Sequence, residues 1–250
     1  WRNMPETALV PGLIARAGAR AATMIEAGPG VARKASPVSY PEPAAADTGT
    51  LAGVAEGVRA CRRCPLHAPA TQAVPGEGPA DTRVMVVAEQ PGDAEDLAGR
   101  PLIGPAGRVF DEALKRVGLE RSGLYVTNAV KHFKFAPRGK RRLHVRPGAG
   151  EAAHCRWWLD REIDLLRPRL IVAMGATAVA AITGHGDGVT RLRGSIIPLA
   201  DGMSMLVTVH PAYMLRLTGQ EEKRRAWQDF LADLGLVRPF LAGPAATAER

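Results

Sequence analysis

The sequence has little cysteine, no long apolar run and one basic segment without a single acidic residue. Only three of its 250 residues are Cys, an odd number that argues against a disulfide framework and suits a reducing compartment. The nearest candidate for a membrane span, residues 170–184, is interrupted by Gly and Thr, and no secretory leader is evident. We therefore expect a cytoplasmic, monomeric protein with no membrane partner.

The composition is that of a globular protein with a surplus of basic residues. Apolar residues make up 46% and charged residues 23% of a chain long enough for one large domain, or for one domain and a tail. The formal charge of +8 favours a polyanionic partner, although charge alone identifies none.

Proline marks a boundary near the start of the chain. Residues 28–48 hold four prolines and many small residues, which are typical of an extended linker. We therefore expect the compact domain to span 49–236 and to be followed by a flexible tail at 237–250. Ahead of the linker, residues 5–27 have a moderately helical pattern.

Strand-like and helix-like segments alternate within the expected domain. Short apolar runs typical of strands buried on both faces occur at 83–89, 124–130, 170–175 and 204–210. Helical patterns separate or follow these runs at 106–118, 151–166, 176–183 and 222–234. The alternation predicts an α/β fold, a three-layer α/β/α sandwich around a mainly parallel four-stranded sheet, to which 194–200 adds a short edge strand.

Polar residues stand where these strands end, which is where ligands bind in open α/β sheets. Glu89 ends the first strand, so its carboxylate can point into the binding crevice. Asn128 ends the second strand and is suited to reading the amide-like edge of a pyrimidine, although alone it would be an ordinary strand-end cap. His210 ends the last strand, and the convergence of several strand ends favours a functional role over a structural one.

The first strand is followed by an acidic segment, 89–96, with four carboxylates. A solvated loop is the simplest interpretation for Asp93, Glu95 and Asp96.

A C-x-x-C pair, Cys61 and Cys64, is followed far downstream by Cys155. Such thiolates can hold a metal ion or one edge of an iron–sulfur cluster, and a fourth ligand could be His132 or His154. The spacing does not separate zinc from iron–sulfur, and a redox pair or plain buried thiols are the alternatives.

The segment 131–146 contains seven Lys or Arg, two Phe and two His, and no acidic residue. This density of positive charge suits contacts with nucleic-acid phosphates. A solvated loop or a disordered basic arm is the alternative. Because the segment interrupts a regular α/β pattern beside the strand ends, we favour a basic loop that binds nucleic acid.

Four segments of the chain, in one consistent order, resemble signatures of the uracil-DNA glycosylase superfamily. They are AEQPGDAEDLAGRPLIGPAG, VTNAVKHFKF, GKRRLH and VTVHPAYMLR. The resemblance covers about residues 50–236 and is strongest to the iron–sulfur, family 4-like branch, within it to the UdgX type that cross-links itself to DNA. Residues 1–27 instead resemble the tail of a different domain that is sometimes fused upstream.

The resemblance implies a [4Fe-4S] cluster held by Cys61, Cys64, His132 and Cys155. His132 stands where ordinary family 4 enzymes have a cysteine and UdgX-type proteins have a histidine. This leaves His154 as a bystander. The cluster would be architectural and would pin the basic loop to the sheet.

The resemblance also implies that uracil is flipped out of single- or double-stranded DNA before its glycosidic bond is reached. The uracil-binding residues would be Gln90, Asp96, Leu102 and Asn128, with Asn128 rejecting cytosine. The DNA-binding residues would be Lys140, Arg141, Arg142, Arg146 and Arg216.

Three residues would carry the chemistry. His210 would stabilise charge on uracil O2 as the bond breaks and the sugar becomes cationic. His144 would then attack C1′ and stay attached, while Glu89 orients it by a hydrogen bond. The implied activity is that of a single-turnover uracil-DNA glycosylase.

Two residues depart from the family pattern. Leu102 stands where a Phe usually stacks on uracil, and losing that platform costs about 1–3 kcal/mol if it is not replaced. Ala212 stands where a Ser commonly contacts phosphate.

Three alternatives remain. One is a hydrolytic family 4-like glycosylase that turns over, and another is a non-catalytic module that binds uracil-containing DNA. An electron-transfer protein is a weaker alternative, because it gives no role to Asn128, Glu89 or His210.

Overall fold

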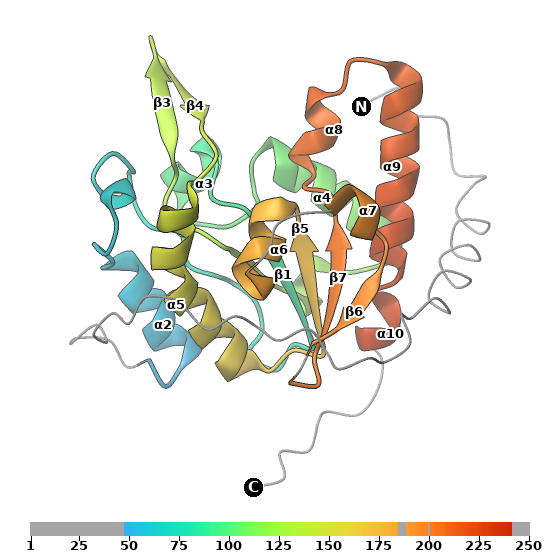
Figure 1. Ribbon diagram of the computed structural model, residues 1–250, viewed down its shortest axis with the longest axis horizontal. Helices are drawn as coiled ribbons and strands as arrows, with labels where there is room; N and C mark the ends of the chain where they lie inside the picture. The colour runs from blue at the N-terminus through green and yellow to red at the C-terminus, as the bar shows by residue number, and fades with distance from the viewer. Residues whose placement is uncertain (1–47, 185–188, 200, 242–250) are drawn as a thin grey trace, which may run out of the picture.

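The computed structural model describes residues 48–184, 189–199 and 201–241 (Figure 1). Its centre is a five-stranded sheet of order β2-β1-β5-β7-β6. The parallel strands are β1 (Val84–Ala88), β2 (Tyr125–Asn128), β5 (Leu170–Met174) and β7 (Ser204–Thr208). The edge strand β6 (Ile196–Pro198) runs antiparallel to β7. The predicted mainly parallel core is confirmed, with the edge strand at the place that the sequence suggested.

The parallel strands end level with one another, which sets up the site. Ala88 pairs with Asn128 at the ends of β1 and β2, and Met174 pairs with Thr208 at the ends of β5 and β7. Every residue of β1 and β5 is buried, as expected for strands covered on both faces. The polar residues that follow these strands are therefore gathered at one edge of the sheet.

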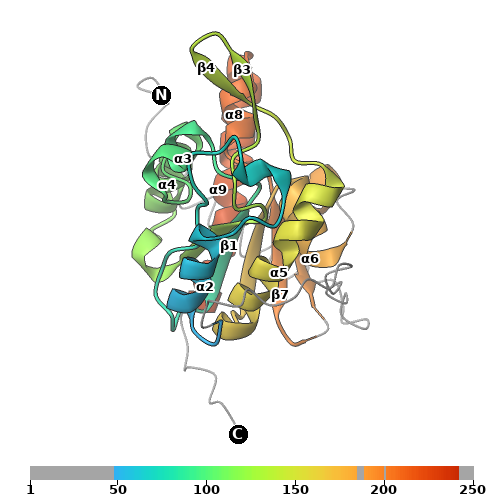
Figure 2. The ribbon, with the colours of Figure 1, turned by 90° about the vertical axis from the view of Figure 1, so that its left-hand side faces the viewer.

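Helices cover both faces of the sheet, which confirms the three-layer sandwich; Figure 2 shows α4 and α5 on opposite sides. One face packs against α4 (Pro105–Arg116), α8 (Ala212–Arg216), α9 (Gln220–Gly235) and α10 (Arg238–Leu241). The other face packs against α5 (Ala149–Leu166), α6 (Ala176–Thr183) and α7 (Val189–Leu192). The first described helix, α2 (Leu51–Arg59), packs on Trp158 of α5. Short helices at α3 (Asp93–Ala98), η1 (Pro65–His67) and η2 (Arg121–Gly123) complete the connections.

The basic segment is a β-hairpin and not the loop that the sequence suggested. Strands β3 (Phe135–Arg138) and β4 (Arg141–His144) pair antiparallel, and the turn has Gly139 at φ +58°, a conformation that glycine adopts without strain. The hairpin stands above the carboxyl ends of the strands (Figure 1). The alternation of side chains that a hairpin needs is masked in the sequence because apolar and basic residues are mixed on both of its faces.

The fold extends past residue 236, where the sequence placed the domain boundary. Val237 is buried, and the Arg238 guanidinium donates to the Val117 carbonyl oxygen at 2.7 Å. The predicted upstream tail and all but one residue of the predicted linker lie outside the described residues, as does 242–250. Among the helices that are described, none has the length and apolar character needed to cross a membrane.

Candidate active site

Glu89 connects the end of β1 to two other parts of the fold. Its Oε2 accepts a hydrogen bond from the Thr177 hydroxyl at 2.9 Å, and its Oε1 lies 3.3 Å from Nε2 of His144. Thr177, at the start of α6, also accepts a hydrogen bond from Arg146 Nε at 3.3 Å. The hairpin, the sheet and α6 therefore meet at this carboxylate.

The Glu89 carboxylate is ionised at neutral pH. Burial acts to raise its pKa, but the hydrogen bonds from His144 and Thr177 and the nearby His210 outweigh burial and lower the pKa. In this arrangement Nε2–H of His144 donates to the carboxylate, which leaves the lone pair on Nδ1. Because the His144 side chain is 49% exposed, an incoming ligand can reach the ring.

His210 is a neutral imidazole. Burial lowers its pKa to about 4, against the opposing effect of Glu89, and electrostatic interactions with His144 and Arg216 lower it further. Its Nδ1 accepts a hydrogen bond from the Ala212 backbone N–H at 3.2 Å. The proton of the neutral ring is therefore on Nε2, where it can be donated to a ligand.

Asn128, the last residue of β2, has a buried donor with no protein acceptor. The side chain is 2% exposed, and its Nδ2 has no hydrogen-bond partner within the described part of the chain. An unpaired buried donor costs about 1–3 kcal/mol and is rare in folded proteins. Such a donor at the carboxyl edge of the sheet is suited to an acceptor on a ligand.

The side chain of Gln90 points to the hairpin. Its Oε1 accepts from the Lys134 N–H at 3.0 Å, and its Nε2 donates to the carbonyl oxygens of Lys134 and Val145 at 3.2 and 3.0 Å. The structure therefore uses this amide to hold both strands of the hairpin against β1. The expected contact with uracil involves backbone around Gln90, and it stays a prediction.

The solvated-loop interpretation of the acidic segment is wrong for two of its three carboxylates. Asp96 is fully buried; its oxygens accept the Thr71 N–H at 3.0 and 3.1 Å and bind Arg142 Nη1 at 2.5 Å. Glu95 is also buried, and it accepts backbone N–H groups of Gly92, Ile103 and Gly104. Both are needed because buried backbone donors require acceptors. Asp93, with its side chain 55% exposed, is solvated as expected. The contact of Asp96 with uracil stays a prediction.

Leu102 lies in a strained and buried turn. Its φ of +53° is in the left-handed region, and the side chain is 4% exposed in the apolar cluster beside α4. Its carbonyl oxygen accepts from Arg121 Nη1 at 2.9 Å, and a Cβ added to Gly107 would lie 2.0 Å from the same oxygen. The turn is therefore held by Arg121 and needs glycine at 107.

The predicted DNA-binding cations fall into two groups. Lys140 and Arg141 at the hairpin, Arg146 after it and Arg216 at the end of α8 are all exposed. Arg142 is instead occupied by protein groups: it binds Asp93 at 2.6 Å and Asp96 at 2.5 Å.

The Arg142 guanidinium also lies 5.5 and 5.1 Å from the ring centroids of Phe133 and Phe135. The ion pairs of Arg142 with Asp93 and Asp96 anchor the hairpin to α3. A contact between Arg142 and DNA would have to compete with them.

The cysteines lie in two buried clusters: Cys64 packs with Cys155, and Cys61 packs with Trp158. Cys61, Cys64 and Cys155 are buried and form no disulfide within the described residues. A hydrogen bond with Cys155, and further contacts with His132, lower the pKa of Cys64 to about 4 despite burial. The Cys64 hydrogen bond and burial raise the pKa of Cys155.

Two donors stabilise these sulfur atoms. The indole N–H of Trp158 lies 3.2 Å from Cys61 Sγ, and the Lys131 N–H lies 3.4 Å from Cys155 Sγ.

This donor set fits the iron–sulfur cluster that the sequence suggested. His132 is 1% exposed, and its Nδ1 has no hydrogen-bond partner among the described residues, as a ligand nitrogen requires. No three such side chains in the described chain converge as they would on a single metal ion. A cluster is bulkier than an ion and needs ligands arranged around it. His154, whose ring contacts the Gly150 carbonyl on the exposed side of α5, is outside the set.

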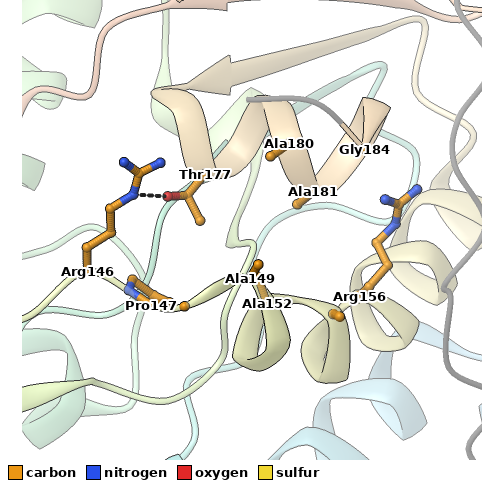
Figure 3. Close-up of a pocket in the computed structure, with 11 residues that line it drawn as sticks. Arg146, Pro147, Ala149, Ala152, Arg156, Thr177, Ala180, Ala181 and Gly184 are labelled. Carbon is orange, nitrogen blue, oxygen red and sulfur yellow. Dashed lines mark hydrogen bonds between the residues drawn. The ribbon is translucent and has the colours of Figure 1, made fainter. Parts of the chain in front are cut away.

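A cavity of about 380 Å³ lies between α5 and α6, next to the Glu89 contacts (Figure 3). Its walls are mostly small apolar side chains, among them Ala152 and Ala181, and Arg146 and Thr177 lie at one side. Asn128 and His210 do not line it. The cavity is therefore separate from Asn128 and His210.

Three residues of this region escaped sequence reasoning. Thr177 lies in the helix predicted at 176–183, for which the sequence suggested no function. Lys131 and Glu162 form a buried ion pair, and the Lys131 ammonium also contacts the Asn128 carbonyl oxygen. A threonine two residues after the glycine that ends a strand was a usable signal. The ion pair had none, because its members are 31 positions apart.

Comparison with known proteins places these features in a family. The model of the uracil DNA glycosylase superfamily matches residues 75–231. A type-4 uracil-DNA glycosylase of Thermotoga maritima is 38% identical over 177 residues, covering 70% of this chain and 88% of the relative. One of Pyrobaculum aerophilum is 37% identical over 180 residues, covering 67% and 87%. This chain belongs to the uracil-DNA glycosylase superfamily.

Proposed function

We propose that this protein removes uracil from DNA. The observation that carries the proposal is the presence of two ligand donors at the same carboxyl edge of the sheet, the unpartnered amide of Asn128 after β2 and the neutral imidazole of His210 after β7. The relatives in the comparison are named as type-4 uracil-DNA glycosylases, which supports the same activity.

The two donors suit the two carbonyl groups of uracil. Asn128 Nδ2 donates to O4 while its Oδ1 accepts from N3–H, whereas cytosine presents the reverse pattern at these positions. His210 Nε2–H donates to O2, where charge develops as the bond to the sugar breaks. The neutral imidazole still carries one N–H at neutral pH. It can therefore donate a hydrogen bond to the anion that forms on the base without being protonated first.

We further propose that His144 captures the sugar, as in the UdgX type. The C1′–N1 bond breaks and both electrons leave with uracil, while the Nδ1 lone pair of His144 forms a bond to C1′. The resulting imidazolium transfers its Nε2 proton to Glu89 or to water. The contact of Glu89 with His144 and the presence of His132 in the cysteine set support this branch.

Cys61, Cys64, His132 and Cys155 would hold a [4Fe-4S] cluster, whose contribution here is structural. Its ligands come from the segment after α2, from the hairpin base and from α5. Loaded, these residues would fix the hairpin base relative to the sheet, so that the hairpin carries His144 to a defined place.

The exposed cations would hold the DNA. Lys140 and Arg141 extend from the hairpin above the strand ends, while Arg146 and Arg216 lie nearer the catalytic groups. Contacts from such residues to phosphates supply affinity without reading sequence.

A denaturing gel tests the proposal. We expect single-stranded DNA with one uracil to give a heat-stable, shifted protein–DNA band that cytosine and thymine DNA do not give. His144→Ala should abolish the band, and His154→Ala, at a histidine outside the site, should not.

Three other outcomes would redirect the proposal. Alkali-labile strand breaks without a shifted band would favour the hydrolytic alternative, which the type-4 relatives also support. If the gel showed neither strand breaks nor a shifted band, the non-catalytic binding module would be the remaining interpretation. A band that persists in His144→Ala would exclude His144 as the nucleophile.

A further inference from the structure

Lys131 is a fully buried lysine at the base of the hairpin. Its ammonium donates to the Thr127 hydroxyl at 2.6 Å, to the Asn128 carbonyl oxygen at 2.9 Å and to Glu162 Oε2 at 2.7 Å. Three acceptors satisfy all three donors of an ammonium group. The lysine is therefore held in one place, with one of its bonds on the backbone of the residue that reads the base.

The position of Asn128 explains why such a bond matters. β2 is at the edge of the sheet, so β1 is its only neighbour among the strands of that sheet. The strand ends at Asn128, and the chain then turns toward His132 and the hairpin. On its other side β2 is held by an isolated backbone bridge between Glu77 and Val126, two residues before Asn128. At Asn128 itself, the Lys131 ammonium supplies a charged hydrogen bond to the carbonyl oxygen.

Glu162 of α5 completes the network. It is fully buried, and its Oε1 accepts from the Gly76 N–H at 3.2 Å and from the Tyr125 hydroxyl at 3.3 Å. Burial and the Glu162 carboxylate raise the pKa of Tyr125, so the hydroxyl remains a donor. Both carboxylate oxygens also accept from Thr127, at 3.1 and 3.0 Å. The network thus ties α5 to the end of β2.

Stability alone does not account for this ion pair. Replacing a buried pair with apolar side chains of similar size is often neutral or stabilising, because burying two charges is costly. A second pair, Lys134–Glu151, joins the same hairpin base to the same helix with side chains 29% and 23% exposed. Tethering to α5 is therefore available without a buried pair. What Lys131 adds is its bond to Asn128.

We propose that the Lys131–Glu162 pair is a positioning device for base recognition, which holds the backbone of Asn128 so that its amide matches uracil and not cytosine. The inference rests on the proposed function. Lys131 is a positioning residue, because it acts through Asn128 and not on the base.

The experiment removes the pair without leaving a lone buried charge. Lys131→Met with Glu162→Met replaces both members with apolar side chains, and Lys134→Met with Glu151→Met is the matched control. Uracil preference is measured as the affinity for uracil-containing DNA relative to cytosine-containing DNA, with the His144→Ala change in every protein to prevent cross-linking. Circular dichroism and the visible absorbance of the cluster check that each variant is folded and loaded.

We expect the Lys131/Glu162 double variant to lose about tenfold of its uracil preference, the equivalent of roughly one net hydrogen bond. The control should stay within about twofold of the parent, because a partly exposed pair contributes little. A folded, loaded double variant with the parent's preference would overturn the inference.

A second measurement does not depend on uracil recognition. Amide hydrogen exchange of the peptide covering 125–131 should be faster in the Lys131/Glu162 double variant than in the parent, and unchanged in the control. Unchanged exchange in that variant would overturn the inference by itself. If the parent shows no preference for uracil DNA, the proposed function fails, and the exchange still reports whether the pair holds Asn128.

Discussion

The base and the tip of the hairpin that the basic segment forms both carry cations, but their environments are opposite. At the base, Lys131, His132 and Phe133 are at most 1% exposed, whereas every residue from Arg138 to Arg141 at the tip is exposed. At the base, a cation is bound by a fixed set of protein acceptors. At the tip, cations are left to solvent and to a polyanion. The same residue type therefore has a structural role at one end and a binding role at the other.

Histidine shows the same contrast. The His144 ring at the end of β4 is half-exposed and is oriented by Glu89, while His210 is shielded enough for its pKa to fall to about 4. In the proposed function, the exposed ring of His144 is accessible to the sugar, and the neutral ring of His210 donates to the base. The local dielectric, more than the identity of the side chain, separates these roles.

The largest expected effect comes from breaking the buried pair on one side only. Lys131→Met leaves Glu162 buried without its cation and should reduce the free energy of unfolding by about 3–5 kcal/mol. Lys134→Met, at the partly exposed pair with Glu151, should reduce the free energy of unfolding by about 1 kcal/mol or less. Urea denaturation measures both. Equal losses would mean that burial does not distinguish the two pairs.

His210 should make the stability of the protein depend on pH. The pKa of His210 is about 4 in the folded protein, against about 6.5 in an unfolded chain. Below pH 6.5 the unfolded chain therefore binds a proton that the folded protein does not. His210 thus lowers stability progressively as the pH falls from about 6.5 toward 4. Glu89, His144 and Arg216 are the titratable or charged groups that influence the pKa of this ring.

Urea midpoints of the parent measured between pH 7.5 and 4.5 test this dependence. His210→Gln should flatten the decline, because glutamine does not titrate. If His210→Gln left the decline unchanged, its source would be another group.

The smallest expected effect distinguishes two neighbouring arginines. Arg141→Ala should reduce the salt dependence of DNA binding by about one unit of slope, as expected for the loss of a phosphate contact. Arg142→Ala should leave the slope unchanged but slow adduct formation, because Arg142 binds Asp93 and Asp96 and holds the hairpin. Fluorescence anisotropy at several salt concentrations gives the slopes. A reduced slope for Arg142→Ala would show that it leaves its carboxylates for DNA.

Much of the fold follows from local pattern. The apolar runs predicted the four parallel strands to within two residues, because strands buried on both faces exclude charge. The helix at 176–183 was predicted at its observed bounds, and the glycine on either side explains why. The level strand ends then bring Glu89, Asn128 and His210 to one edge, since parallel strands end on the same side.

The hairpin and the buried carboxylates did not follow from local pattern. Apolar and basic residues are mixed on both faces of the hairpin, so the sequence shows no apolar alternation there. Asp96 is a surface residue by composition, and only its contacts with Thr71 and Arg142, 25 and 46 positions away, make it part of the interior.

The sequence by itself determined the layers, the strand ends and the chemistry present there, because these depend on hydrophobic periodicity and chain order. Only the tertiary structure decided which cations are available for DNA and which are bound within the protein. It also decided that His210 is neutral and that Lys131 holds Asn128. Those outcomes depend on burial and on partners far apart in the chain, and neither is encoded in the immediate sequence neighbours.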